Sequence, residues 1–250
     1  MENKRKAHYV VGLGEVGEPL YLNIKEFEPC VGLDIDTPTP IEACDVMHVC
    51  IGQKDDKFAE IVVSYVERFS PRLLIINSTV KPGTCEKIAG LVDIPVAHSP
   101  IRGKHVRMKE DQRLYDKFVG GVTEEAGELA EEHLKNVGFR VRRLKNATTT
   151  ELAKISCTSY FGVLIAWAQE VERYCDEFDL DYDEVISIYE EVPYFPTAKF
   201  FSGEIGGHCV IPNIKLLQQV TTGPLVQAVL DSNALKVTRE QGEGDLKKAQ

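Results

Sequence analysis

The chain has 250 residues and a formal net charge of −10, and 43% of its residues are hydrophobic. This length and composition exclude a disordered chain and indicate a globular protein with room for one large or two modest domains. The negative charge disfavours a nucleic-acid or anionic membrane surface, and no apolar run reaches transmembrane length. We therefore expect neither nucleic acid nor membrane among the partners.

Seven cysteines are scattered along the chain, and no two of them form a C-x-x-C pair. An odd number without clustering predicts neither a disulfide framework nor a zinc site, so we expect no metal. Reduced thiols indicate a cytoplasmic protein. The charged segment 1–6 leads directly into the first apolar run, so we expect no export signal.

Residues 9–17 read Y-V-V-G-L-G-E-V-G, an apolar run followed at once by a glycine-rich turn. Segment 18–25 continues with helical spacing, so strand, turn and helix follow one another as in a dinucleotide-binding motif. Gly12 would allow the tight turn, Gly14 the approach of a pyrophosphate, and Gly17 the close packing of helix on strand. The free N–H groups at the helix N-terminus would then face the phosphates.

A second apolar run, 30–35, places Asp34 about twenty residues beyond the glycines, where a carboxylate can bind the ribose hydroxyls. The same carboxylate would repel a 2′-phosphate, so we expect NAD rather than NADP as cofactor. The alternative is an ordinary strand-turn-helix unit that binds no nucleotide. The residues expected to contact the cofactor are Gly12, Gly14, Glu15, Val16, Gly17, Asp34 and Ile35.

Strand-like and helix-like stretches alternate from residue 7 to about residue 144, which predicts an α/β fold with a Rossmann-like, doubly wound, mainly parallel sheet. Segment 99–116 is densely charged and has no clear periodicity, so we expect a long loop, either functional or merely solvated. Further strands are expected at 46–51, 73–77, 95–98, 118–122 and 139–144, and helices at 56–69 and 123–136.

The pattern changes at Thr148, which has capping-box spacing to Glu151. Apolar residues then recur every three or four positions to Phe178, which predicts one helix of about thirty residues whose apolar stripe could form a homodimer seam. A shorter helix is expected at 181–192, a loop at 193–212, and one or two helices at 213–236, interrupted at Gly223-Pro224. The expected domains are a Rossmann domain at 1–146, an all-helical dimerisation and substrate domain at 147–236, and a frayed tail at 237–250.

Segment 203–209, G-E-I-G-G-H-C, is the second informative stretch. Its glycines would let the backbone approach a ligand, and His208 could assist ionisation of the Cys209 thiol. Pro212 followed by Asn213 resembles a helix start just behind it. The alternative is that Cys209 is a small buried apolar residue in a turn.

The sequence resembles the UDP-glucose/GDP-mannose dehydrogenase family, NAD-dependent enzymes that oxidise a sugar C6 alcohol to a carboxylate in two hydride transfers. The matching motifs span 9–213 in the expected order. They are G-L-G-E-V-G at 12–17, G-L-D-I-D at 32–36, N-S-T-V-K-P-G-T at 77–84, Ser99-Pro100, E-L-A-K at 151–154, I-A-W-A-Q-E at 165–170 and G-G-H-C at 206–209.

The resemblance implies that Cys209 is a nucleophile that attacks the aldehyde intermediate and that Lys154 stabilises the alkoxide or moves its proton. It places Thr79, with Ser78, beside the nicotinamide. The alternatives are an exposed lysine on a helix flank and a threonine that caps a strand-to-helix turn. The residues expected to contact the substrate are Thr158, Gly207, His208 and Arg102.

Three positions depart from the family pattern, because Ile101 replaces a glutamate, Thr158 an asparagine and Asn213 an aspartate. Asn213 can orient a water but cannot act as its base, so hydrolysis of a thioester is the step most affected. Glu204, Glu151 or His208 are the possible substitutes.

Family members also carry a third, nucleotide-binding domain, and the resemblance does not extend to it. A partner would then supply that domain, or the substrate is smaller. The cations of segment 102–109 would bind a phosphate or carboxylate of such a small substrate, or belong to a solvated loop.

The leading expectation is an NAD-dependent dehydrogenase acting on a primary alcohol of a sugar or nucleotide sugar, with Cys209 and Lys154 central. One alternative is a single-step β-hydroxyacid-type dehydrogenase that uses Lys154 without a covalent intermediate. The other is a non-catalytic NAD-binding accessory subunit.

Overall fold

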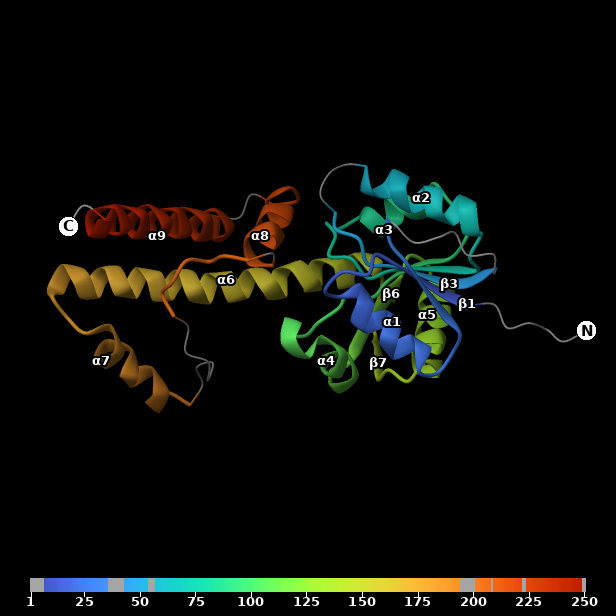
Figure 1. Cartoon of the computed structure of the whole chain (residues 1–250), viewed down its shortest axis with the longest axis horizontal. Coiled ribbons are helices and arrows are strands. Elements are labelled where there is room, and N and C mark those ends of the chain that lie inside the picture. The colour runs from blue at the N-terminus through green and yellow to red at the C-terminus, as the bar shows by residue number, and fades with distance from the viewer. Residues whose placement is uncertain are drawn as a thin grey trace, which may run out of the picture. The chain divides into compact units, whose positions relative to one another are not determined.

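The structure is a computed structural model that describes residues 7–35, 43–53, 57–193, 201–207, 209–221 and 224–248 (Figure 1). The chain divides into two compact units, Met1–Lys154 and Ile155–Gln250. We call them the Rossmann unit and the helical unit and describe each by itself. The long helix α6 (Ala147–Phe178) begins in the first unit and continues in the second.

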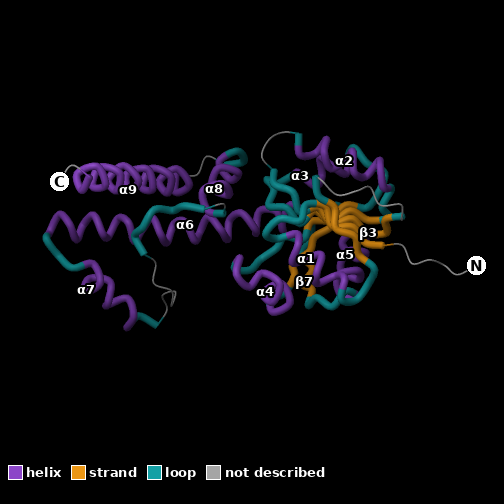
Figure 2. Tube along the Cα trace, viewed as in Figure 1, coloured by secondary structure: helices purple, strands orange, loops and turns teal. Residues whose placement is uncertain are grey.

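Within the described residues, seven strands form one sheet in the order β2-β1-β3-β4-β5-β6-β7. Figure 2 draws the strands in orange. Neighbouring strands are parallel except β5 and β6, which are antiparallel. Their short apolar runs suit strands covered on both faces. The bounds are β1 Ala7–Val11, β2 Cys30–Leu33, β3 Cys44–Val49, β4 Leu73–Ile76, β5 Val96–His98, β6 Lys117–Gly121 and β7 Val141–Arg143.

Helices cover both faces of this sheet (Figure 1). Tyr9 of β1 packs in a core with α2 (Phe58–Phe69) and α3 (Thr84–Ala89). The next residue, Val10, packs in a second core with α1 (Gly17–Lys25) and α5 (Glu124–Asn136). Because successive strand residues point to opposite faces, one strand feeds both cores, and the doubly wound α/β class is confirmed.

One sequence-based expectation in the Rossmann unit, the long loop at 99–116, is wrong. Segment 99–116 is not a plain loop, because it contains the 3-10 turn His105–Arg107 and helix α4 (Met108–Leu114). Its turn is held by buried Asp111, which accepts a hydrogen bond from the Lys104 N–H at 2.9 Å and pairs with Arg107 at 3.2 Å. The helix escaped detection because Met108 alone supplies a buried apolar side chain in it.

The helical unit contains α7 (Tyr182–Ser187), a 3-10 turn (Ile188–Glu191), α8 (Val210–Gln218) and α9 (Pro224–Lys248), besides the rest of α6. Its core joins Ile205, Val210, Ile214 and Val229. Helix α9 continues to Lys248, where the sequence pattern predicts a frayed tail from residue 237. Among the described residues, no helix combines the length and the apolar character needed to cross a bilayer.

Candidate active site

The glycine-rich turn of the Rossmann unit lies between β1 and α1 and depends on close backbone packing. Gly12 has φ +88°, a conformation that side chains rarely adopt, and a Cβ on it would lie 2.9 Å from the Ile51 side chain. A Cβ on Gly17 would lie 1.8 Å from the carbonyl oxygen of Gly12 and 2.9 Å from Cβ of Cys50. Both glycines are therefore required by the fold itself.

Gly14 differs from the other two because a Cβ placed on it would meet nothing within 4 Å. The space above its backbone is open, as the approach of a pyrophosphate requires. Behind it, α1 begins at Gly17, and its N-cap residue Val16 makes no side-chain capping hydrogen bond. The helix therefore directs its N-terminal partial positive charge toward this open turn. Glu15 is exposed in the same turn.

Asp34 follows β2 and reaches across to the glycine-rich turn. One carboxylate oxygen, Oδ2, accepts a hydrogen bond from the Leu13 N–H at 2.8 Å, and Oδ1 accepts one from the Ile35 N–H at 2.8 Å. The pairing of Val11 with Leu33 in neighbouring strands brings the two segments together. The carboxylate is exposed, so it can also accept hydrogen bonds from a ribose diol. Ile35 beside it is 94% exposed.

A buried polar network fixes the carboxyl ends of the next strands. Asn77 donates from Nδ2 to the Ser99 carbonyl oxygen at 2.6 Å, and its Oδ1 lies 2.9 Å from Nδ1 of His48. The network thus assigns the proton to Nδ1 of His48. Burial lowers the pKa of His48 to about 3, so this ring is neutral. Ser78 donates to the Val49 carbonyl oxygen at 3.2 Å, and Thr79 follows it, partly exposed.

Lys117 is a buried cation that sequence reasoning missed. Lys117 is the first residue of β6. Its ammonium group donates to the Ser99 carbonyl oxygen at 3.3 Å and lies 5.7 Å from the Phe139 ring centroid. Burial lowers its pKa to about 8, and the charges of Lys154 and Arg102 contribute to the lowering. These cations therefore share one electrostatic neighbourhood in the Rossmann unit. The sequence signal for this group was a lysine at the start of a buried apolar run.

Glu151 has a structural role that excludes it as a free base. It is fully buried, and its two carboxylate oxygens accept the backbone N–H groups of Gly83 at 2.7 Å and Cys85 at 2.8 Å. Burial is the largest influence on its pKa and raises it. The expected capping box is therefore wrong, because α6 is capped by Asn146, whose Oδ1 accepts the Thr149 N–H at 2.9 Å.

Two cations of segment 102–109 are matched by carboxylates of the protein itself. Lys109 pairs with Glu26 at 2.7 Å, and Arg107 pairs with Asp111, so both charges are matched by carboxylates. Arg102 is exposed, donates to the Asp116 carbonyl oxygen at 2.9 Å and lies 4.7 Å from the Phe118 ring centroid. Arg107 and Lys109 are thus less suited to bind an anion, whereas Arg102 remains a candidate for contact with a substrate.

Cys209 lies in the helical unit at the N-cap of α8. It is exposed, which excludes the expectation of a buried apolar residue, and its carbonyl oxygen accepts the Asn213 N–H at 3.1 Å. The helix starts at Val210, earlier than Pro212 suggested. The thiol thus stands at the N-terminal end of a helix, which carries a partial positive charge.

The remaining expected residues of the helical unit have diverse settings. Asn213 is buried on α8, and Thr158 is partly buried on α6. Gly207 is exposed with φ +78° and has no neighbour within 4 Å of an added Cβ. His208 lies outside the described residues. All seven cysteines are free thiols, and no group of described side chains has the arrangement of a metal site.

Comparison with known proteins gives a consistent family. Residues 148–236 match the family model described as UDP-glucose/GDP-mannose dehydrogenase family, central domain. A UDP-N-acetyl-D-mannosamine dehydrogenase of Methanocaldococcus jannaschii is 31% identical over 180 residues, which cover 70% of this chain. The match spans 42% of the length of that relative.

Solved structures show the same fold. The UDP-D-ManNAc dehydrogenase of Pyrococcus horikoshii matches with a TM-score of 0.85 at 24% identity, covering 97% of this chain and 72% of its own. The Mycobacterium tuberculosis 3-hydroxyisobutyrate dehydrogenase matches with a TM-score of 0.70 at 14% identity, covering 92% of both chains. Residues 148–236 of this chain therefore match the central domain of the UDP-glucose/GDP-mannose dehydrogenase family, and the chain is similar in sequence and in fold to nucleotide-sugar dehydrogenases.

Proposed function

We propose that the protein is an NAD-dependent dehydrogenase that oxidises a primary alcohol of a nucleotide sugar. The observation that carries this proposal is the turn formed by Gly14 and Asp34, where open backbone and an exposed carboxylate adjoin a helix N-terminus. The names of the relatives, which are dehydrogenases of nucleotide sugars, support the substrate class.

The residues of the glycine-rich turn fit NAD. The open face of Gly14 and the N-terminus of α1 would hold the pyrophosphate, and Asp34 would hold the ribose diol. Two backbone N–H groups hold the Asp34 carboxylate beside the turn, where it would repel a 2′-phosphate. When bound, NAD accepts the hydride that leaves the carbon in each oxidation. Ser78 and Thr79, fixed at the end of β4, would border its nicotinamide end.

The side chains of this protein would divide the remaining chemistry among them. Lys154, by its place in the E-L-A-K motif, would stabilise the alkoxide or take the proton of the alcohol. The sulfur of Cys209 would bond to the carbonyl carbon of the aldehyde and give a thiohemiacetal, whose oxidation gives a thioester. Water would then cleave the carbon–sulfur bond and release the acid and the thiol.

Hydrolysis of the thioester is the step for which this site is least equipped. Asn213 is buried one helical turn after Cys209 and can orient water by hydrogen bonding, but it cannot accept its proton. Glu151 is occupied by two backbone N–H groups. We therefore propose that hydrolysis is slow relative to the two oxidations. Thr158, Gly207, His208 and Arg102 remain the proposed contacts of the substrate.

We also propose a cytoplasmic homodimer. The free state of all seven cysteines fits a reducing compartment. On α6, Tyr160, Trp167 and Tyr174 recur every seven residues and are 56%, 52% and 45% exposed. Such a stripe of large exposed aromatic side chains is typical of a helix that packs against another chain.

The test measures NADH formation by purified protein with NAD and a panel of UDP-sugars, GDP-sugars and small hydroxy acids. We expect two NADH per nucleotide sugar, and a Cys209→Ser variant that yields one or none. Cys157→Ser, which removes another exposed thiol, is the matched control and should behave as wild type. One NADH with an indifferent Cys209→Ser would establish single-step oxidation of the alcohol. Intact NAD binding without turnover on any substrate would establish an accessory subunit.

A further inference from the structure

The loop that precedes Cys209 is held by a partly buried amide of helix α9, the side chain of Asn233. Oδ1 of Asn233 accepts the backbone N–H of Ile205 at 2.7 Å, and its Nδ2 donates to the Ile205 carbonyl oxygen at 3.4 Å. One side chain therefore pairs with both backbone polar groups of a single loop residue. This replaces the pairing that a strand or helix would provide.

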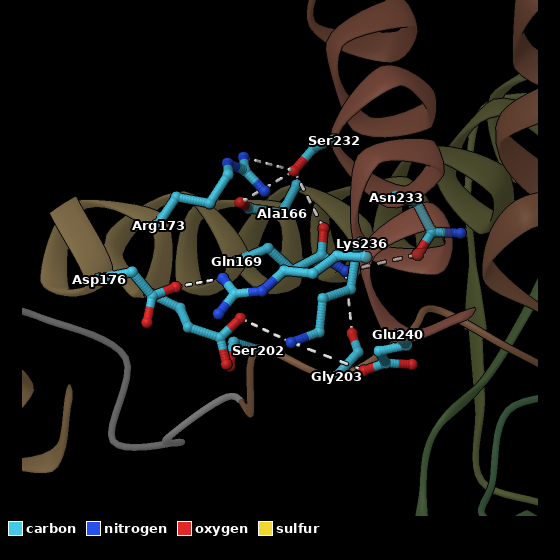
Figure 3. Close-up of polar contacts among 12 residues, drawn as sticks. Ala166, Gln169, Arg173, Asp176, Ser202, Gly203, Ser232, Asn233, Lys236 and Glu240 are labelled. Carbon is cyan, nitrogen blue, oxygen red and sulfur yellow. Dashed lines mark hydrogen bonds and ion pairs between the residues drawn. The ribbon is translucent and has the colours of Figure 1, made fainter. Parts of the chain in front are cut away.

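A second amide, from α6, holds the same loop two residues earlier. Gln169 is fully buried, and its Nε2 donates to the Gly203 carbonyl oxygen at 2.8 Å and to Oδ1 of Asn233 at 3.3 Å. Its Oε1 accepts a hydrogen bond from the Ser232 hydroxyl at 3.0 Å. The two amides thus form one network that joins α6, α9 and the loop (Figure 3).

An ion pair fixes the start of the loop. The Ser202 hydroxyl donates to Oε1 of Glu172 at 2.7 Å, while Oε2 of Glu172 pairs with Nζ of Lys236 at 2.6 Å. The Lys236 side chain is 11% exposed, so this pair is largely shielded from solvent. Ser202, Gly203 and Ile205 are therefore all tied to α6 or α9.

These contacts determine where the thiol can lie. Ile205 is 4% exposed and packs in one core with Val210 and Ile214 of α8, while the carbonyl oxygen of Cys209 accepts the Asn213 N–H. The chain is thus anchored four residues before Cys209 and directly after it. Burying an amide costs free energy unless its polar atoms are hydrogen-bonded. The buried Gln169 and the partly buried Asn233 are bonded to loop backbone, to each other and, through Gln169, to the Ser232 hydroxyl.

We propose that Asn233 and Gln169 are positioning residues for the Cys209 thiol. Their role in catalysis rests on the proposed function, in which Cys209 captures an aldehyde. Their role in holding the loop does not depend on it. Loss of either amide would free the segment from Gly203 to Ile205, so that Cys209 meets the aldehyde less often and more aldehyde escapes.

The experiment compares Asn233→Ala and Gln169→Ala with two reference variants. Asn233→Asp keeps the oxygen that accepts the Ile205 N–H, so this variant should hold the loop nearly as well as wild type does. Val171→Ala removes methyl groups from a separate core of the helical unit, formed with Cys175 and Ile186, and so controls for loss of stability alone.

Hydrogen exchange of segment 201–207, followed by mass spectrometry, reads the loop directly. We expect exchange to be about tenfold faster in Asn233→Ala and Gln169→Ala than in wild type. Val171→Ala should exchange at the wild-type rate, and Asn233→Asp at nearly that rate. The second readout is the fraction of product released as aldehyde, trapped with methoxyamine. It should rise about tenfold in the alanine variants, with kcat for acid lower and KM for NAD unchanged.

Wild-type exchange in both alanine variants would overturn the proposal. So would faster exchange with an unchanged aldehyde fraction in an active enzyme, because the amides would then stabilise the loop without positioning the thiol. If wild type itself turns over no nucleotide sugar, the proposed function fails. The exchange data then still decide whether Asn233 and Gln169 hold the loop.

Discussion

Gly14 and Gly17 stand three residues apart in one turn, and the structure predicts opposite effects for the same substitution. In Gly17→Ala the new Cβ would lie 1.8 Å from the Gly12 carbonyl oxygen, so backbone must move by more than an ångström. Forced repacking of this kind costs about 3 kcal/mol. For a unit of this size, that loss lowers the melting temperature by about 6–12 °C.

Gly14→Ala adds the same methyl group where nothing lies within 4 Å, so the free energy of unfolding should change by less than about 0.5 kcal/mol. The methyl group would instead stand between backbone and pyrophosphate and weaken NAD binding about tenfold, or about 1.4 kcal/mol. Circular dichroism melting and isothermal titration calorimetry measure the two effects. Unchanged NAD affinity in Gly14→Ala would refute the placement of the cofactor on this turn. Equal melting temperatures of the two variants would refute the packing argument.

Three further predictions concern buried charge and assembly. Burial lowers the pKa of Lys117 from 10.5 to about 8, so between these pH values the unfolded state binds one more proton than the folded state. Wild type should therefore gain about 3 kcal/mol of stability from pH 8 to 10.5. Urea unfolding should show that Lys117→Met lacks this gain. His48, with a pKa of about 3, stays neutral in the folded protein, whereas in the unfolded chain it binds a proton below about pH 6.5. Wild type should therefore lose stability as pH falls below 6.5, by about 1.4 kcal/mol per pH unit more than His48→Gln does. Trp167→Glu, which places a charge in the exposed aromatic stripe of α6, should shift the protein from dimer to monomer in light scattering; an unchanged mass would exclude this face as the seam.

The sequence alone determined the features that depend on local pattern. The glycine spacing at 12–17 and the acidic residue at 34 are read within one strand-turn-helix-strand unit, and the structure places Asp34 in hydrogen-bond contact with that turn. The alternation of apolar runs predicted the doubly wound sheet, because strands buried on both faces need continuous apolar residues. The long helix followed from its three- and four-residue periodicity.

Helix α4 was not predictable in this way, because its contacts come from one methionine and from a buried aspartate that pairs within its own segment. Glu151 illustrates the same limit at the site. Its spacing to Thr148 suggested a capping box, but both of its oxygens bind backbone more than sixty residues away in sequence.

Only the tertiary structure decided which polar residues support the site. Lys117 and Asn233 lie in segments whose local pattern carries no mark of function, and the motifs that contain Asn77 and Gln169 do not reveal what these side chains contact. The partners of all four are distant in sequence. A buried amide or ammonium group is stable only where folding brings it a hydrogen-bond partner. Local spacing therefore specified the strands, the glycine-rich turn and the proposed nucleophile Cys209, whereas the packing of distant segments specified the groups that hold them in place.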